Sequence, residues 1–335
     1  RAVAHHRLAA HAQVVDGPVK PAKPRIGGGG CGRGHQPRSG HRARAPPPGH
    51  AAIELGFRGV NTTINHQAVS GEAAIAYGAM EIRRGAADVI LVGGADLLSP
   101  FFYEVLCRFR ALSPMDNGVE AARPYDLRRN GPVMGEGCGI VCLEAKEHAS
   151  ARGADPYCEL AGWGLAASPA PPAGWPDSPR GLVIALRRAL DMAGVVPVGT
   201  GSATPGGRPQ DDRRRSEGGA PAGIDCIQGA GNGGRDQDAL EAAAYRELFG
   251  GDEGMPLVTS LKGATGEIFA SGGIRAAALA LSIREGVVPP VAGLAAPMLP
   301  LPFVTGEARR RSVGRALLSG LSFGGTYAGL VFGAV

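Results

Sequence analysis

A lysine and two glutamates are the ionisable residues of this sequence best placed to do chemistry. Lys262 and Glu267 are five residues apart in the stretch Ser-Leu-Lys-Gly-Ala-Thr-Gly-Glu, and Glu136 lies in a Gly-Glu-Gly turn. Such side chains either form structural ion pairs or act as an acid or base with a shifted pKa. We expect Lys262 to pair with Glu267 or with Glu136. For Glu136 itself, a structural hydrogen bond and a catalytic role both remain open.

The thiols and imidazoles form no catalytic or metal-binding motif of their own. None of the six cysteines belongs to a Cys-x-x-Cys pair, and only His66 and His148 of the eight histidines lie after residue 50. Cys138 and Cys142 are four residues apart in an apolar stretch, which favours core thiols over metal ligands. We therefore expect no metal site, no disulfide framework and a reducing compartment.

Composition and charge exclude several classes of protein. Of the 335 residues, 44% are hydrophobic and 19% charged, as in globular domains. No apolar run reaches the roughly 18–20 residues of a membrane-spanning helix, and the first residues do not resemble a secretory signal. Residues 1–50 hold nine Lys and Arg against one acid, so the net charge of +5 comes from that segment. A basic nucleic-acid-binding arm is an alternative. Since aromatic residues are not interleaved, we expect no nucleic-acid or membrane partner and a cytoplasmic location.

Two segments differ in composition from the rest of the chain. Residues 1–50 contain runs of four Gly and three Pro, and residues 198–223 are similarly rich in Gly, Pro and charge. We predict that residues 1–50 are a disordered basic segment without helical or strand period, and that 198–223 is a flexible linker. The linker would separate two ordered parts, 51–197 and 224–335. The same composition also fits a GC-rich gene read in a shifted frame.

The elements that must position the ionisable residues alternate between helix and strand. Apolar residues at helical spacing predict helices over 70–85, 145–152, 182–193, 238–249 and 272–284. In the first of these, Ser70 is a plausible N-cap and the small residues Gly71, Ala74 and Gly78 form a face for close packing. Short apolar runs between turn residues predict buried strands over 88–94, 139–144, 224–227, 257–260, 315–319 and 329–332. This alternation is typical of a layered α/β fold.

Six motifs follow one another at characteristic spacing over residues 51–335. They are Gly-Val-Asn-Thr with Ala-Val-Ser-Gly (59–71), Ala-Arg-Pro-Tyr-Asp to Gly-Glu-Gly (122–137), Ile-Asp-Cys-Ile-Gln-Gly-Ala-Gly (224–231), the lysine stretch (260–267), Gly-Val-Val-Pro-Pro (286–290) and Ser-Phe-Gly-Gly-Thr-Tyr (322–327). Each is weak alone. In this order they closely resemble the β-ketoacyl-acyl-carrier-protein synthases, the ketosynthases of fatty-acid and polyketide assembly.

The resemblance implies a fold and a reaction. The fold is the thiolase-like five-layer α/β/α/β/α sandwich of two similar halves, usually found as a dimer. The reaction is a decarboxylative Claisen condensation on substrates carried by the phosphopantetheine arm of an acyl carrier protein, with no further cofactor. A Cys at a sharp strand-to-helix turn takes the acyl chain as a thioester, and two His residues assist decarboxylation and stabilise the oxyanion.

All three catalytic side chains are absent from the matching positions. Counted without gaps, the nucleophile position falls on Ala68, the first His position on Ala230 and the second on Glu267. Lys262 and the Phe-Gly-Gly-Thr loop remain, although Tyr327 replaces the usual Asn. The resemblance implies that the backbone N–H groups of Ala68 and Phe323 could still form an oxyanion hole. It further implies substrate contacts from Gln67, Asn232, Lys262, Thr265, Phe323 and Gly324.

The nucleophile position also comes unusually early in the chain. In the family it follows well over a hundred residues, whereas here it is residue 68, so the N-terminal half is expected to be truncated, with an exposed sheet edge and apolar surface. The leading hypothesis is a chain-length-factor-like subunit that pairs with an active ketosynthase. Such subunits carry Gln near the turn, and Gln67 is one residue away. The alternatives are an acyltransferase or decarboxylase with residual activity, and a decayed, non-functional homologue.

Overall fold

The computed structural model describes residues 8–11, 47–115, 119–172, 174–196, 223–250 and 255–335. The chain divides into two compact units, one of residues 14–63 and one of residues 1–13 with 64–335. In the smaller unit, helix α1 (Pro47–Leu55) begins at two prolines, where a missing backbone N–H costs nothing. The prediction of no helical or strand period before residue 51 was therefore wrong for residues 47–50, and it was also wrong for residues 8–11, which form a strand of the larger unit. Most of the predicted disordered segment, and the predicted linker apart from Gly223, lie outside the described residues.

One eight-stranded mixed sheet forms the larger unit. Its strand order is β2-β3-β1-β4-β10-β9-β5-β6. The strands are β1 (Leu8–His11), β2 (Val89–Asp96), β3 (Gly137–Ala145), β4 (Cys158–Ala167), β5 (Cys226–Gln228), β6 (Leu257–Thr259), β9 (Arg315–Ser322) and β10 (Thr326–Gly333). Following this order, each strand from β2 as far as β9 is antiparallel to the next one. Strand β5 runs parallel to both of its neighbours, β9 and β6. A separate short ribbon pairs β7 (Val287–Val288) with β8 (Arg309–Arg310).

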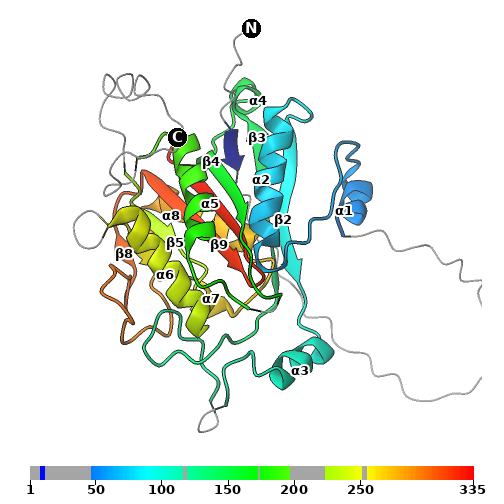
Figure 1. Cartoon of the computed structure of the whole chain (residues 1–335). Helices are drawn as coiled ribbons and strands as arrows, with labels where there is room; N and C mark the ends of the chain where they lie inside the picture. The colour runs from blue at the N-terminus through cyan, green and yellow to red at the C-terminus, as the bar shows by residue number, and fades with distance from the viewer. Residues whose placement is uncertain (1–7, 12–46, 116–118, 173, 197–222, 251–254) are drawn as a thin grey trace, which may run out of the picture. The chain divides into compact units, whose positions relative to one another are not determined.

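Alternate residues of β9 and β10 pack into two different hydrophobic cores, one on each face of the sheet. Leu317 and Val331 pack with helices α5 (Arg180–Met192) and α6 (Arg235–Phe249) on one face of the sheet. Leu318 and Leu330 pack on the other face with α2 (Ser70–Arg83) and α8 (Gly272–Glu285). Figure 1 shows α5 and α2 lying along the strands. This period of two explains why both strands read as continuous apolar runs in the sequence.

The predicted elements match the structure, and β4 is the main strand that the sequence did not reveal. Its register against β10 places Gly162 and Gly164 beneath α5. A Cβ atom at these glycines would lie 2.2 Å from the carbonyl oxygen of Ala189 and 2.1 Å from that of Ala185. Glycine is depleted in strands because it has no side chain to pack. Here helix α5 can lie close to the strand only because these positions have no side chain. The glycines that the packing requires therefore weaken the pattern by which the strand could be predicted from the sequence.

Helices α2 and α8 pack together on one face of the sheet, and their first turns cross at very short range. A Cβ atom at Gly71 would lie 2.6 Å from the backbone nitrogen of Gly272, and one at Gly78 would lie 2.5 Å from Cγ1 of Val92. The prediction that α2 is centrally packed through small residues is confirmed at these two glycines. Ala74 was placed on the same face wrongly, since it is half-exposed beside the exposed Tyr77.

The start of α2 differs from its predicted cap. Val69 is the N-cap residue, and Ser70 is the first residue of the helix. The Ser70 hydroxyl donates to the carbonyl oxygen of Gln67 at 2.6 Å and accepts from the His66 N–H at 2.9 Å. Ser70 therefore fastens the preceding turn instead of capping α2.

We predict that Gly71→Ala destabilises the protein by about 1–3 kcal/mol, the usual cost of overpacking a filled core. The added methyl group would meet the backbone of α8, which cannot move without disturbing its packing on the sheet. Urea unfolding followed by circular dichroism measures the effect. The matched control is Gly59→Ala, because no atom lies within 4 Å of a Cβ at Gly59. Equal unfolding midpoints for the two variants would contradict the described helix crossing.

The part of the sheet that comes before residue 150 is small and incompletely covered. Its strands are β1, β2 and β3, and the helices α3 (Pro100–Arg108) and α4 (Lys146–Ala151) belong to the same stretch of chain. The outward-facing side chains of Val89, Leu91 and Ile140 are 43%, 40% and 50% exposed, and β2 lies at the end of the sheet. The expected exposed edge and apolar surface are confirmed. Within the described ranges, no helix is both long and apolar enough to span a bilayer.

Candidate active site

The nucleophile position lies in a tight turn that leads into α2. Residues Gln67–Val69 form a 3-10 turn, and Gln67 has a left-handed backbone with φ of +53°. The buried Ala68 donates its N–H to Oγ of Ser322 at 3.3 Å, and this hydroxyl donates to Oε1 of Gln67 at 3.0 Å. The turn is thus tied to the end of β9. A methyl group occupies the counted nucleophile position. The backbone N–H of the same residue, Ala68, is bonded to Ser322, which comes directly before the C-terminal glycine loop.

A buried ion pair lies at Glu267, the residue that the motif spacing predicts for the second histidine position. The Lys262 ammonium lies 2.8 and 2.9 Å from the two carboxylate oxygens of Glu267, and both side chains are fully buried. Lys262 is the first residue of the short helix α7 (Lys262–Thr265). The backbone of Glu267 is held by two hydrogen bonds: its carbonyl oxygen accepts the Gly135 N–H, and its N–H donates to the Val133 carbonyl oxygen. Of the two predicted partners of Lys262, Glu267 is the correct one. Glu136 instead accepts the Leu98 N–H at 3.1 Å, which supports its structural interpretation.

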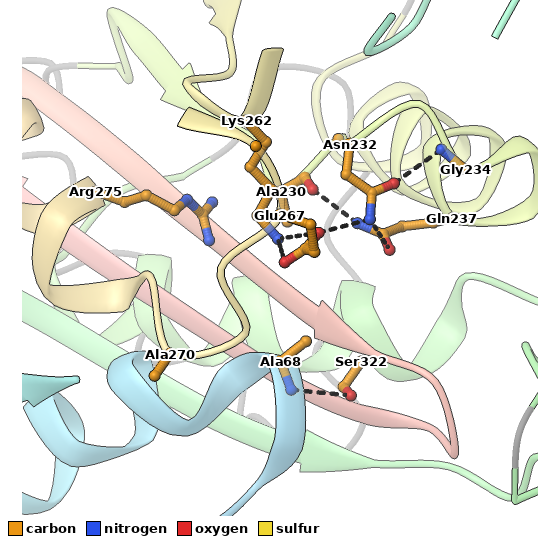
Figure 2. A network of polar contacts seen from close by, with 12 residues as sticks. Ala68, Ala230, Asn232, Gly234, Gln237, Lys262, Glu267, Ala270, Arg275 and Ser322 are labelled. Atoms are coloured by element: carbon orange, nitrogen blue, oxygen red, sulfur yellow. Dashed lines mark hydrogen bonds and ion pairs between the residues drawn. The ribbon is translucent and has the colours of Figure 1, made fainter. Parts of the chain in front are cut away.

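Asn232 connects this ion pair to the first histidine position. Its Nδ2 donates to Glu267 at 2.6 Å and to Oε1 of Gln237 at 3.1 Å. Nε2 of Gln237 in turn donates to the carbonyl oxygen of Ala230 at 2.7 Å. Figure 2 shows these side chains as one chain of contacts, with Ala68 and Ser322 in the same view. The structure therefore brings the predicted residues Asn232, Lys262 and Glu267 into direct contact.

A second buried ion pair, between Glu72 and Arg275, connects α2 to α8 and was not found from the sequence. Nη1 of Arg275 lies 2.5 Å from the Glu72 carboxylate, and Nη2 donates to the carbonyl oxygens of Ser319 and Gln228 at 2.5 and 3.0 Å. Burial raises the pKa of Glu72, although the positive charge of Arg275 opposes the shift. The two residues are 203 positions apart, so no local spacing could indicate the pair.

Two acidic residues of α6 hold the loop that carries Ala230 and Asn232. Asp238 accepts hydrogen bonds from the backbone N–H groups of Tyr125, Asn232 and Gly233. Burial raises the pKa of its carboxyl group to about 7, although the hydrogen bonds from Tyr125 and Asn232 act in the opposite direction. Glu241 accepts the Ala230 N–H and the hydroxyls of Tyr125, Tyr245 and Ser319. The loop backbone is therefore fixed even though it carries no histidine.

The C-terminal glycine loop keeps its turn but has one changed role. Gly324 and Gly325 both have left-handed backbones, with φ of +76° and +80°, and Phe323 packs edge-on against Phe269. Tyr327 is fully buried beneath α5, where its hydroxyl lies 2.9 Å from Oγ of Ser168. A Cβ at Gly181 would lie 2.3 Å from this ring. Tyr327 is therefore part of the core and not of the site.

The remaining candidates lie apart from this network. Thr265 is exposed, and its hydroxyl contacts only backbone carbonyl oxygens of its own turn. His66 packs edge-on against Tyr77, and Nδ1 of His148 lies 2.5 Å from the buried Glu144. The expectation of core thiols was wrong for Cys138, which is exposed on β3. Among the described residues, no cluster of three or more His, Cys, Asp or Glu could hold a metal ion.

Comparisons with known proteins agree with this geometry. The family model for the β-ketoacyl synthase N-terminal domain matches residues 30–149, and the model for the C-terminal domain matches residues 214–295. A putative polyketide β-ketoacyl synthase 1 of Streptomyces halstedii is 34% identical over 87% of this chain and 65% of its own. The 3-oxoacyl-[acyl-carrier-protein] synthase 2 of Rhizobium meliloti is 32% identical over 84% of this chain and 63% of its own.

Solved structures give the same assignment. The ishigamide ketosynthase/chain length factor matches with a TM-score of 0.72 and 30% identity over 86% of this chain and 64% of that one. A type II polyketide acyl-carrier protein in complex with its ketosynthase matches with a TM-score of 0.75 and 26% identity, covering 86% and 66% of the two chains. The chain belongs to the β-ketoacyl synthase family and has its thiolase-like fold. It spans about 65% of the length of the curated relatives.

Proposed function

We propose that this chain is a non-condensing subunit that pairs with an active ketosynthase in polyketide or fatty-acid assembly, in the manner of a chain length factor. The observation that carries the proposal is the buried network of Lys262, Glu267 and Asn232, which fills the space of the two histidines. Both Glu267 oxygens are already engaged by donors 2.6–2.9 Å away. With the Ala68 methyl at the nucleophile position, neither Ala230 nor the ion-paired Glu267 offers a side-chain donor for a developing enolate.

Catalysis would then belong to the partner, and this chain would supply surface. Ala74 and Tyr77 lie on the accessible face of α2, immediately after the turn, within the Gly59–Gly94 stretch that we infer makes the dimer contact. Tyrosine is enriched at protein interfaces because it combines a large apolar area with a polar tip. Substrates would arrive on the phosphopantetheine arm of an acyl carrier protein, with no cofactor bound by this chain.

A residual acyltransferase or decarboxylase activity is the alternative function, and the site supports it less. It would need Lys262 or Glu267 as a reacting group. In a buried pair each group satisfies the charge of the other, and separating them would leave a buried charge unpaired. A decayed homologue would show neither activity nor pairing.

Co-expression tests the proposed pairing. Tagged full-length chain is expressed with a type II ketosynthase, and the amount of co-purified partner is measured for the parent chain and for Tyr77→Asp. A charge in the centre of an apolar interface should reduce capture at least about tenfold, since it must be desolvated without a partner. Tyr77→Phe and Val196→Asp, a change at another exposed apolar residue, should retain capture. Equal capture by Tyr77→Asp would overturn the α2 interface.

Covalent labelling separates the alternatives. The electrophile cerulenin should leave peptide 59–83 unlabelled, because Ala68 offers no nucleophilic atom. Acyl transfer from acyl-carrier protein by the isolated chain would favour the residual enzyme. Failure of both pairing and acyl transfer would favour the decayed homologue.

A further inference from the structure

Four buried polar atoms around the crossing of α2 and α8 have no hydrogen-bond partner within the described part of the chain. They are Oε2 of Glu72, Nε of Arg275, Nε2 of Gln228 and Oγ of Ser271. Each of these residues is at most 2% exposed, so bulk solvent does not reach them. A buried polar group without a hydrogen bond costs free energy, and such groups in folded proteins are paired with other protein atoms or with an internal water molecule.

The backbone brings these four side chains to one place. Gln228 is two residues from Cys226 on β5, so its side chain lies on the face of the sheet that carries the core of α2 and α8. The carbonyl oxygen of Gln228 accepts from Nη2 of Arg275 at 3.0 Å. Ser271 lies one helical turn before Arg275 and accepts its backbone N–H at 2.9 Å. Glu72 reaches the same place from α2, through its ion pair with Arg275.

The Glu72 carboxylate and the Ser271 hydroxyl both lie at the start of α8. A Cβ atom at Gly272, the residue after Ser271, would lie 2.8 Å from Oε2 of Glu72. A serine directly before a helix usually caps it by accepting a backbone N–H. The hydroxyl of Ser271 makes no such bond to α8. It is therefore available to a ligand beside the carboxylate.

The hydrogen-bonding roles of the four atoms complement one another. The amide nitrogen of Gln228 and Nε of Arg275 can only donate, the free carboxylate oxygen of Glu72 accepts, and the Ser271 hydroxyl can do either. A water molecule both accepts and donates two hydrogen bonds, and buried waters typically make about three. A cation at this place would face two N–H donors, and an anion would face the carboxylate. Water is thus the ligand that this set of atoms fits.

We infer that the crossing of α2 and α8 contains a binding site for internal water, which accepts hydrogen bonds from Gln228 and Arg275 and donates to Glu72 and Ser271. The water would connect the buried ion pair to the end of β5 and to the start of α8. Because all four residues are buried, the site is no part of the surface proposed for pairing and does not depend on that proposal.

The water site adjoins the network at the second histidine position. The charges of Lys262 and Glu267 both act on the pKa of Glu72, in opposite directions. Figure 2 shows Arg275 in the same view as this second ion pair. Two buried ion pairs would therefore lie next to one another, with the water held by the Glu72–Arg275 pair.

A crystal structure of the full chain at a resolution that shows ordered water tests the site directly. We expect a water molecule within hydrogen-bonding distance of Nε2 of Gln228 and Oε2 of Glu72. A crystal soaked in rubidium chloride should show no anomalous peak at this place. A rubidium peak would overturn the inference, because the ligand would then be a monovalent cation. So would direct hydrogen bonds among the four side chains with no water between them.

Magnetic relaxation dispersion of the solvent tests the site in solution, because its amplitude reports long-lived internal waters. Gln228→Leu removes a donor and places apolar atoms beside the site, and it should lower the amplitude by the contribution of about one water. Ser271→Ala should also lower it and serves if Gln228→Leu folds poorly. The matched control is Ser282→Ala, a buried serine of α8 whose hydroxyl already donates to the Ala278 carbonyl oxygen at 3.0 Å. It should keep the parent amplitude. Unchanged amplitudes in both Gln228→Leu and Ser271→Ala would contradict the proposed site.

Discussion

An Ala68→Cys variant should gain a thiol that can be acylated but no condensation activity. The new side chain would lie at the start of α2, where the helix N-terminus favours a thiolate. Condensation also needs a donor for the enolate and thioester oxygens, and Ala230 and the ion-paired Glu267 provide none. Mass spectrometry of peptide 59–83 after incubation with acyl-carrier protein should show a thioester. Chromatography should show condensed product at background.

The control for this experiment is Ala74→Cys, one turn further along α2 on its accessible face. That thiol would lie outside the turn of residues 67–69. It should therefore be alkylated by general thiol reagents but not acylated from the carrier protein. Condensed product from Ala68→Cys alone would contradict the assigned site, since it would mean that other groups replace both histidines.

An Arg275→Met variant should lose about 3–5 kcal/mol of unfolding free energy, the cost of leaving a buried charge without its partner. Glu72 would remain between α2 and α8 with no guanidinium, and the carbonyl oxygens of Ser319 and Gln228 would each lose a donor. Replacing both partners, as in Glu72→Leu with Arg275→Met, should recover much of the loss because no charge is left buried. Guanidinium chloride unfolding measures all three proteins.

Arg284→Met is the matched control for this prediction. Arg284 also forms an ion pair, with Asp155 at 2.8 Å, but the two side chains are 40% and 80% exposed. Exposed pairs contribute about 0–1 kcal/mol, so this variant should unfold near the parent. A loss at Arg275 no larger than that at Arg284 would show that the Glu72 pair is not closed off from solvent.

Local pattern was sufficient for most of the fold. The strands ending at Ser322 and beginning at Thr326 contain apolar residues on both faces, and the helices carry an unbroken apolar stripe, so each could be predicted from a few adjacent residues. The sequence also named Glu267 as one of two candidate partners of Lys262, and the two residues are only five positions apart. Where structure depends on a distant partner, the sequence made no prediction, as for β4 with its glycines beneath α5 and for the packing of Tyr327 against Gly181.

In the candidate site, too, local sequence was sufficient for some features, whereas others depend on distant partners. Motif spacing predicts Ala68, Ala230 and Glu267 as the catalytic positions but could not show which contacts their neighbours make. Asn232 links two loops, and Glu72 meets Arg275 across the helix crossing. Those contacts exist only after the two halves of the chain have packed together. No property of either segment alone predicts them.

The pairing of β4 with β10 has a consequence for how the protein is made. Residues 158–167 gain their neighbour only when residues 326–333 have been synthesised. At about 5–20 residues per second, the interval between the two strands lasts roughly 8–30 s. Throughout it, β4 has one unsatisfied edge in the nascent chain, and pairing across so long a sequence separation is intrinsically slow. The centre of this sheet therefore forms only after residues 326–333 have been synthesised, and until then the free edge of β4 is open to non-native pairing.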